Sequence, residues 1–325
     1  STRNCSAYDD FLTLLMSSSA PLVPEGVTEP VKDGCCFPGF GKHPKPIDPT
    51  KIDDEGGHYV TLSDGRILEY FVYGSIKDDA KVLVQILGTC GTGRFFAFVT
   101  DFTNKLEELN IKAIGITVPG HGYSTVKVGR QIVEFAQDIE PILQAVGVSN
   151  FYVEGTSYGT SHAMAIAHRF AKQGRILGMH LHVPYVDKAV ADAEKLSVDG
   201  TAASLHVSTK SLQSCTSCGC GYFCCVSCAY KCMGCCLFST YDDPDYPDSG
   251  KIQAVDLKRS AVHSSYGVVH NSTVEHANLS WGFDLREIKE YLNGPNKVLV
   301  SYAKDDNDAP PAHGEWLGNF FEATV

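Results

Sequence analysis

A serine flanked by two glycines is the residue in this sequence best placed to do chemistry. Gly155-Thr156-Ser157-Tyr158-Gly159 fits the pattern G-x-S-x-G, and it stands between a predicted strand and a predicted helix. A strand that turns at once into a helix strains its turn residue, and small neighbours let the backbone approach closely. The Ser157 hydroxyl would then lie at a helix N-terminus, where the dipole stabilises negative charge. The motif predicts a nucleophile; a glycine-rich packing turn is the alternative.

A serine that attacks a carbonyl needs backbone N–H donors for the oxyanion. The residue after the nucleophile supplies one donor in strand–turn–helix sites, and here it is Tyr158. The second donor comes from a loop after an earlier strand, and the apolar run 81–87 is followed by Gly88-Thr89-Cys90-Gly91. We expect the N–H of Thr89 to be this second donor.

The base that deprotonates such a serine is oriented by an acid. The apolar run KVLVSYA (297–303) is followed by three acidic residues, Asp305, Asp306 and Asp308. A carboxylate at the carboxyl end of this predicted strand could orient the base, and Asp306 is our choice. A solvated acidic loop is the alternative.

The elements that must position these residues alternate between strand and helix from residue 81 onward. Short apolar runs predict strands, and apolar positions at helical spacing predict helices. Two β-type runs around Ser63-Asp64-Gly65 predict a hairpin over 58–74. The strands are expected at 81–87, 111–118, 150–154, 175–186 and 297–303, and the helices at 94–110, 128–147 and 161–174. This order predicts an α/β fold, with a mostly parallel central sheet and helices on both faces.

The same alternation divides the chain into four segments. Residues 1–57 are rich in Ser, Pro, Gly and Asp and indicate an irregular N-terminal extension. Residues 58–186 form the first part of the core, and 286–325 form its C-terminal part. The interruption at 187–285 is too long for a simple loop and predicts an inserted cap over the site.

Four motifs in this order resemble the α/β-hydrolase family: LGTCGTGR (87–94), VPGHGYS (118–124), EGTSYGTSHAMAIA (154–167) and VLVSYAKDDNDAP (298–310). The resemblance is to its esterase-, lipase- and peptidase-like branch with a PGHGxS turn. It covers 81–186 and 286–325, and more weakly 58–80. Leu87, Cys90 and Val118 depart from residues frequent in the family.

The resemblance implies Ser157 as nucleophile, Asp306 as acid, and the N–H groups of Thr89 and Tyr158 as the oxyanion hole. It also implies an acyl-enzyme on Ser157 and a small-molecule or lipid-like ester as substrate, with thioesters and amides as related chemistry. No dissociable cofactor is needed for this mechanism.

The histidine that the family places after one further strand is not found. His313 follows Asp306, but it falls in a predicted helix whose packing would hold it away from Ser157. Loop, core or surface roles are expected for the remaining candidates, which are His121, His162, His180 and His182. Either the chain is a C-terminally truncated fragment or the triad is lost. The abrupt end and the missing initial Met favour a fragment.

Nine of the 13 cysteines fall between Cys215 and Cys236, inside the expected cap. Their C-x-x-C steps could bind zinc or an iron–sulfur cluster through thiolates. The apolar segment 221–238 could instead contact a membrane, with acylated cysteines adding to the anchor. Local disulfides and free thiols are the other two interpretations. The sequence leaves all four open, so any metal site is unknown.

Composition removes several classes of function. The 325 residues carry 27 Lys and Arg against 38 Asp and Glu, a net charge of −11 that disfavours general nucleic-acid binding. The sequence has no run of 18 or more apolar residues, so it predicts no membrane-spanning helix, and no signal peptide is visible. Clustered rather than evenly spread cysteines predict a reduced, cytoplasmic protein. A serine hydrolase is the first hypothesis; a non-catalytic binding or regulatory protein with a metal- or lipid-contacting cap is the second.

Overall fold

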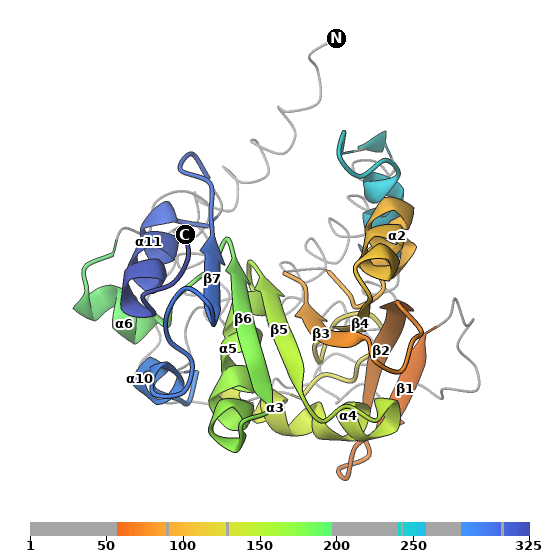
Figure 1. Cartoon of the computed structure of the whole chain (residues 1–325), viewed down its shortest axis with the longest axis horizontal. Helices are drawn as coiled ribbons and strands as arrows, with labels where there is room; N and C mark the ends of the chain where they lie inside the picture. Colours follow the sequence, from red (N-terminus) through yellow and green to blue (C-terminus); the bar gives the residue numbers. More distant parts are fainter. Residues whose placement is uncertain are drawn as a thin grey trace, which may run out of the picture.

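A computed structural model of the chain describes residues 57–88, 91–127, 130–196, 240–241, 243–257, 281–306 and 309–325. Within them, seven strands form one sheet in the order β1-β2-β4-β3-β5-β6-β7 (Figure 1). The strands are His58–Thr61 (β1), Ile67–Gly74 (β2), Lys81–Ile86 (β3), Ile111–Ile116 (β4), Phe151–Thr156 (β5), Ile176–His182 (β6) and Val298–Ser301 (β7). The pairs β1–β2 and β2–β4 are antiparallel and all others are parallel. The predicted mostly parallel α/β fold is confirmed.

Helices cover both faces of this sheet. On one face α5 (Gly159–Phe170) packs against β5 and β6, and the main core lies between this helix layer and the sheet. On the other face α2 (Thr100–Glu108) covers β2 and β4 through a smaller apolar cluster. Further helices are η2 (Phe96–Phe98), η3 (Ile132–Glu134), α3 (Phe135–Asp138), α4 (Glu140–Val146), η4 (Ala171–Gln173), α6 (Lys188–Ala193), α10 (Leu285–Lys289) and α11 (Pro311–Phe320).

The single helix expected over 128–147 is wrong, because the chain forms η3, α3 and α4 there. Pro141 lies in the first turn of α4, and a proline ring clashes with the carbonyl four residues earlier in a continuous helix. The helix therefore restarts after Ile139. The apolar stripe keeps its burial despite the break, since its five members are fully buried: Ile132, Phe135, Ile139, Ile142 and Leu143.

Much of the predicted insertion lies outside the described residues, including 197–239 with its nine clustered cysteines. The extension 1–56 lies outside them as well. In the described part of the chain, none of the helices combines the length and apolar character that a membrane span requires. Across those same ranges, no group of three His, Cys, Asp or Glu side chains is arranged to hold a metal ion.

An ion pair ties the β1–β2 hairpin to α3. Arg66 donates through Nη1 and Nη2 to the two carboxylate oxygens of Asp138, each at 2.7 Å. Its Nε donates to Asp64 Oδ2 at 2.8 Å. The side chain of Asp138 is 12% exposed, whereas that of Asp64 is 46% exposed. The Arg66 guanidinium thus pairs with one carboxylate that is shielded from water, Asp138, and with one that is exposed to it, Asp64.

The two carboxylates provide a matched test of this anchor. We expect Asp138→Asn to lower the free energy of unfolding by about 3 kcal/mol, because it leaves a shielded guanidinium without its bidentate partner. Asp64→Asn should cost less than about 1 kcal/mol, since water screens that pair. Urea denaturation of the two variants measures the difference. Equal losses would contradict the assignment of Asp138 as the anchor.

Candidate active site

β5 leads almost directly into α5 at the carboxyl edge of the sheet (Figure 1). Ser157 occupies the corner between the two elements. Its φ is +53°, a left-handed backbone conformation that is costly for a residue with a side chain. Its N–H donates to the carbonyl of His182 on β6 at 2.9 Å. Its carbonyl accepts from the N–H and the hydroxyl of Thr160, at 3.0 and 2.6 Å. These bonds stabilise the strained corner, and Ser157 stays partly exposed to solvent.

The two glycines of the motif are required by close backbone contacts. A Cβ on Gly155 would lie 2.5 Å from the carbonyl oxygen of Gly159. A Cβ on Gly159 would lie 2.3 Å from the carbonyl oxygen of Ile86, at the end of β3. Neither position has room for a methyl group, so α5 can begin this close to β3 and β5 only with glycine there.

The glycine-rich turn after β3 lies directly beside Ser157. A Cβ on Gly88 would lie 2.8 Å from Cβ of Ser157 and 3.3 Å from its Oγ. The N–H of Gly91 donates to the carbonyl of Gly88 at 2.9 Å, which closes the turn. Thr89, the expected second oxyanion donor, is outside the described residues. Tyr158, the expected first donor, is the N-cap residue of α5, with a buried side chain.

The remainder of this turn rests on a buried carboxylate. The N–H of Gly93 donates to Oγ1 of Thr117 at 2.9 Å, and the Thr117 hydroxyl donates to Oε2 of Glu69 at 2.8 Å. Gly93 also packs against the backbone of Gly115 on β4, where no Cβ would fit. The Glu69 carboxylate reaches the PGHGYS turn too, since the N–H of Tyr123 donates to it at 3.4 Å. Glu69 thus links two of the motifs.

Asp306 lies in the loop between β7 and α11, with Oδ1 accepting from the N–H of Ala309 at 2.9 Å. Ser157 follows β5 and Asp306 follows β7, so β6 separates them in the sheet. Two strand spacings correspond to about 10 Å, a gap that one imidazole and its hydrogen bonds can span. The arrangement suits a nucleophile and an acid on either side of a base.

Two histidines on β6 share one hydroxyl in this gap. His180 Nε2 and His182 Nδ1 both lie 2.8 Å from Oγ of Ser301 on β7. Burial, and then the neighbouring His180, hold the pKa of His182 below its ordinary value, whereas the charges of Glu154 and Asp306 oppose this shift. His182 is therefore electrostatically coupled to the predicted acid. The sequence predicts only core or surface roles for both histidines.

The same hydrogen-bonded row continues across the sheet, on the face opposite α5. His180 Nδ1 lies 3.9 Å from Oε2 of Glu154 on β5, and Nε2 of Gln85 on β3 donates to Oε1 of Glu154 at 3.3 Å. The Tyr73 hydroxyl donates to Oε1 of Gln85. Burial, together with the charge of Glu154, keeps the pKa of Tyr73 well above its ordinary value. Glu154 is the β5 member of this row, and His180 and His182 are its β6 members.

The other three candidate histidines are buried in packing contacts. His121 stacks on the ring of Tyr158 with centroids 6.1 Å apart. His162 Nε2 lies 2.9 Å from Nη2 of Arg130. His313 on α11 accepts from the N–H of Val186 through Nδ1 at 3.3 Å. In the described part of the chain, no histidine hydrogen-bonds to the hydroxyl of Ser157.

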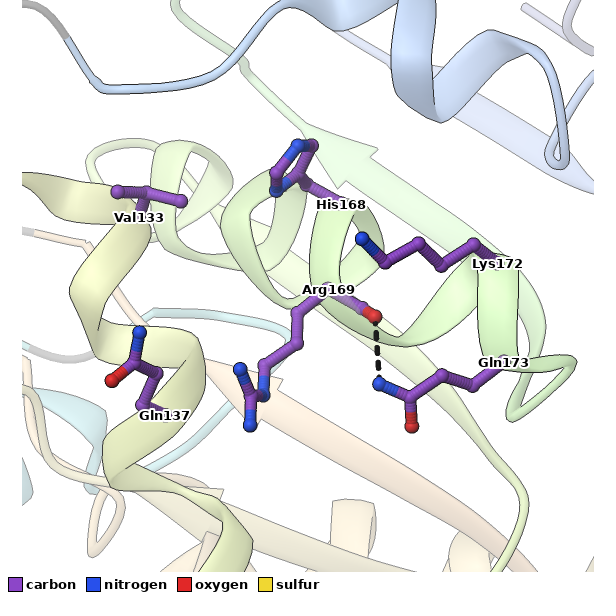
Figure 2. A pocket seen from close by; sticks show the side chains of 6 residues that line it. All are labelled: Val133, Gln137, His168, Arg169, Lys172 and Gln173. Atoms are coloured by element: carbon purple, nitrogen blue, oxygen red, sulfur yellow. Dashed lines mark hydrogen bonds between the residues drawn. The ribbon is translucent and has the colours of Figure 1, made fainter.

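A pocket of about 170 Å³ lies at the far end of α5 (Figure 2). It is lined by Val133, Gln137, His168, Arg169, Lys172 and Gln173. Ser157 precedes the first residue of α5, whereas this pocket lies around its last turn. A helix of 12 residues is about 18 Å long, so the pocket is separate from the candidate active site.

Comparisons with known proteins bear on the fold. Residues 81–199 match a family model described as alpha/beta hydrolase fold. A hydrolase from Pseudomonas aeruginosa PA01 has a similar structure, with 15% identity, a TM-score of 0.54, and coverage of 84% of this chain and 90% of that one. The enol-lactonase from Burkholderia xenovorans LB400 is similar at 17% identity and a TM-score of 0.54, covering 82% and 89%.

An esterase, EaEST from Exiguobacterium antarcticum, is similar at 18% identity and a TM-score of 0.51, covering 81% of this chain and 87% of that one. No curated protein sequence matches. At such low identities a structural likeness establishes the fold and leaves the reaction to the site itself.

The electrostatic coupling at the end of β6 can be measured by NMR titration of His182. We expect His180→Gln to raise the pKa of His182, because it removes a neighbouring group that opposes protonation. Asp306→Asn should lower the same pKa, because it removes a charge that favours the imidazolium. Asp305→Asn is the matched control and should leave it unchanged. An unchanged pKa in Asp306→Asn would place the acid away from β6.

Proposed function

We propose that this chain, which has the α/β-hydrolase fold, is a serine hydrolase that cleaves an ester bond through an acyl-enzyme on Ser157. One observation carries the proposal: Ser157 adopts a φ of +53° at the strand–helix corner and remains partly exposed. Residues with a strained backbone occur mostly at functional sites, and this one lies at the carboxyl edge of the sheet beside a glycine-rich turn. The hydrolase, lactonase and esterase among the similar structures support this class of chemistry.

In the proposed reaction, Ser157 Oγ attacks the carbonyl carbon and its proton passes to an imidazole oriented by Asp306. The N–H groups of Tyr158 and Thr89 stabilise the tetrahedral oxyanion, aided by the positive end of the α5 dipole. The imidazolium then protonates the leaving alcohol, which yields the acyl-enzyme. Water attacks this intermediate with the imidazole as base, and the carboxylic acid leaves.

A small-molecule or lipid-like ester is the proposed substrate, and thioesters and amides share the mechanism. The insertion that follows β6 would select among them, because it comes from the carboxyl edge where Ser157 lies. No dissociable cofactor takes part in these steps.

A second candidate function is a non-catalytic binding or regulatory protein of the same fold, with a cysteine-rich cap that contacts a metal or a lipid surface. It is favoured by one observation, the lack of a hydrogen bond from any described histidine to the Ser157 hydroxyl. The two candidates differ in whether Ser157 reacts, so reactivity discriminates between them.

Labelling with a fluorophosphonate probe tests the enzyme directly. We expect the wild-type protein to be labelled and Ser157→Ala to lose the label, because the probe reacts with activated serine hydroxyls. Ser63→Ala is the matched control, since Ser63 is an exposed serine on the hairpin turn, and it should label normally. Labelling that persists in Ser157→Ala would remove this serine from the mechanism, and an unreactive wild type would favour the binding protein.

A further inference from the structure

The glycine-rich turn beside Ser157 leads directly into a buried arginine. Arg94 follows Gly93, and its side chain is only 7% exposed. Its Nη1 lies 3.5 Å from Oδ1 of Asp256, whose side chain is 2% exposed. Asp256 belongs to the helical residues 249–257 of the predicted insertion, 162 positions further along the chain. A buried ion pair thus joins the turn to the insertion.

Aromatic and apolar contacts accompany this pair. The Arg94 guanidinium lies over the ring of Phe98, 4.0 Å from its centroid. Phe96 meets Tyr246 of the insertion edge-on, with centroids 6.5 Å apart. The helical residues 249–257 bury Ile252, Ala254 and Leu257 next to Asp256. In Figure 1 residues 243–257, drawn in cyan, lie at the same end of the picture as α2, which follows η2 in the chain.

A short series of contacts connects Arg94 with Ser157. The N–H of Arg94 donates to Oγ1 of Thr92 at 3.2 Å, and Thr92 is fully buried. Gly91, the preceding residue, is hydrogen-bonded to Gly88 at 2.9 Å. Gly88 in turn lies against the side chain of Ser157. A displacement of Arg94 would therefore also move the neighbouring turn residues that contact Ser157.

The energetics of the pair point to positioning rather than to stability. Two charges removed from water lose hydration that their attraction barely offsets, so apolar residues of similar size would stabilise the fold equally well. The contact between the Arg94 guanidinium and the Asp256 carboxylate does, however, restrict where the insertion and the turn can lie relative to each other. Loss of Asp256 removes the contact that joins residues 249–257 to Arg94 and changes the charge balance around the buried guanidinium.

We propose that Asp256 is a positioning residue: through Arg94 it holds the oxyanion turn beside Ser157, so that residues 243–257 control the rate of acyl transfer. This inference rests on the proposed function. It makes the insertion part of the catalytic geometry as well as a wall of the substrate site. The prediction is specific to kcat, because a displaced oxyanion donor weakens the transition state more than the bound substrate.

The test compares Asp256→Asn with Asp245→Asn, an exposed acid on the same stretch. With a p-nitrophenyl ester, we expect Asp256→Asn to lower kcat and the rate of fluorophosphonate labelling by about tenfold or more, with KM little changed. Hydrogen exchange of the amides of residues 91–98 should become faster in the same variant. Asp245→Asn should match the wild type in all three measurements.

The double variant Arg94→Leu with Asp256→Leu separates positioning from stability. It removes both buried charges, so we expect it to regain most of the melting temperature lost by Asp256→Asn but not the labelling rate. If both return together, the pair is only structural and the inference is overturned. If the wild type is labelled and Asp256→Asn is labelled at the same rate with the same kcat, the inference is also overturned, and the proposed function stands. If the wild type is unreactive, the proposed function fails. In that case, unchanged hydrogen exchange at residues 91–98 in Asp256→Asn would overturn the positioning contact as well.

Discussion

The close approach of α5 to β3 and β5 is the constraint on which the candidate site depends. Gly155 and Gly159 bring backbone into contact where any side chain would clash, and the chain turns from strand to helix within the three residues between them. At the middle of this turn Ser157 takes a left-handed conformation, stabilised by its hydrogen bonds to His182 and Thr160. The strain is offset by the packed elements on both sides, which leave the hydroxyl at the carboxyl edge of the sheet.

The surrounding structure supports this corner from several directions. Glu69 stabilises two turns: it reaches the turn after β3 through the Thr117 hydroxyl, and it accepts from the N–H of Tyr123 in the PGHGYS turn. On the far side, β6 lies between the strands that precede Ser157 and Asp306, and the carbonyl of its last residue, His182, accepts from the N–H of Ser157. The site is thus assembled from loops whose positions are set by buried polar contacts and rigid strands, as is usual for catalytic loops on an α/β scaffold.

The sequence was most informative where structure is determined locally. The serine corner was predictable because two glycines and the change from strand to helix lie within a few residues. Apolar runs predict the strands, whereas the apolar stripe over 128–147 predicts one helix and outweighs the breaking effect of Pro141. His180, His182 and Ser301 were not grouped, because β7 is 119 residues beyond β6 in the chain. The Arg94–Asp256 pair joins residues still further apart, and no local pattern predicts such partners.

The most direct test of Ser157 as the nucleophile is to trap its covalent intermediate. Protein mixed briefly with an activated ester, quenched in acid and digested, can be mapped by mass spectrometry. The acyl group should appear on the peptide that contains Ser157 within the first turnover and disappear once the ester is consumed. An acyl group on another residue, or ester hydrolysis with no acylated peptide at any time, would contradict the account.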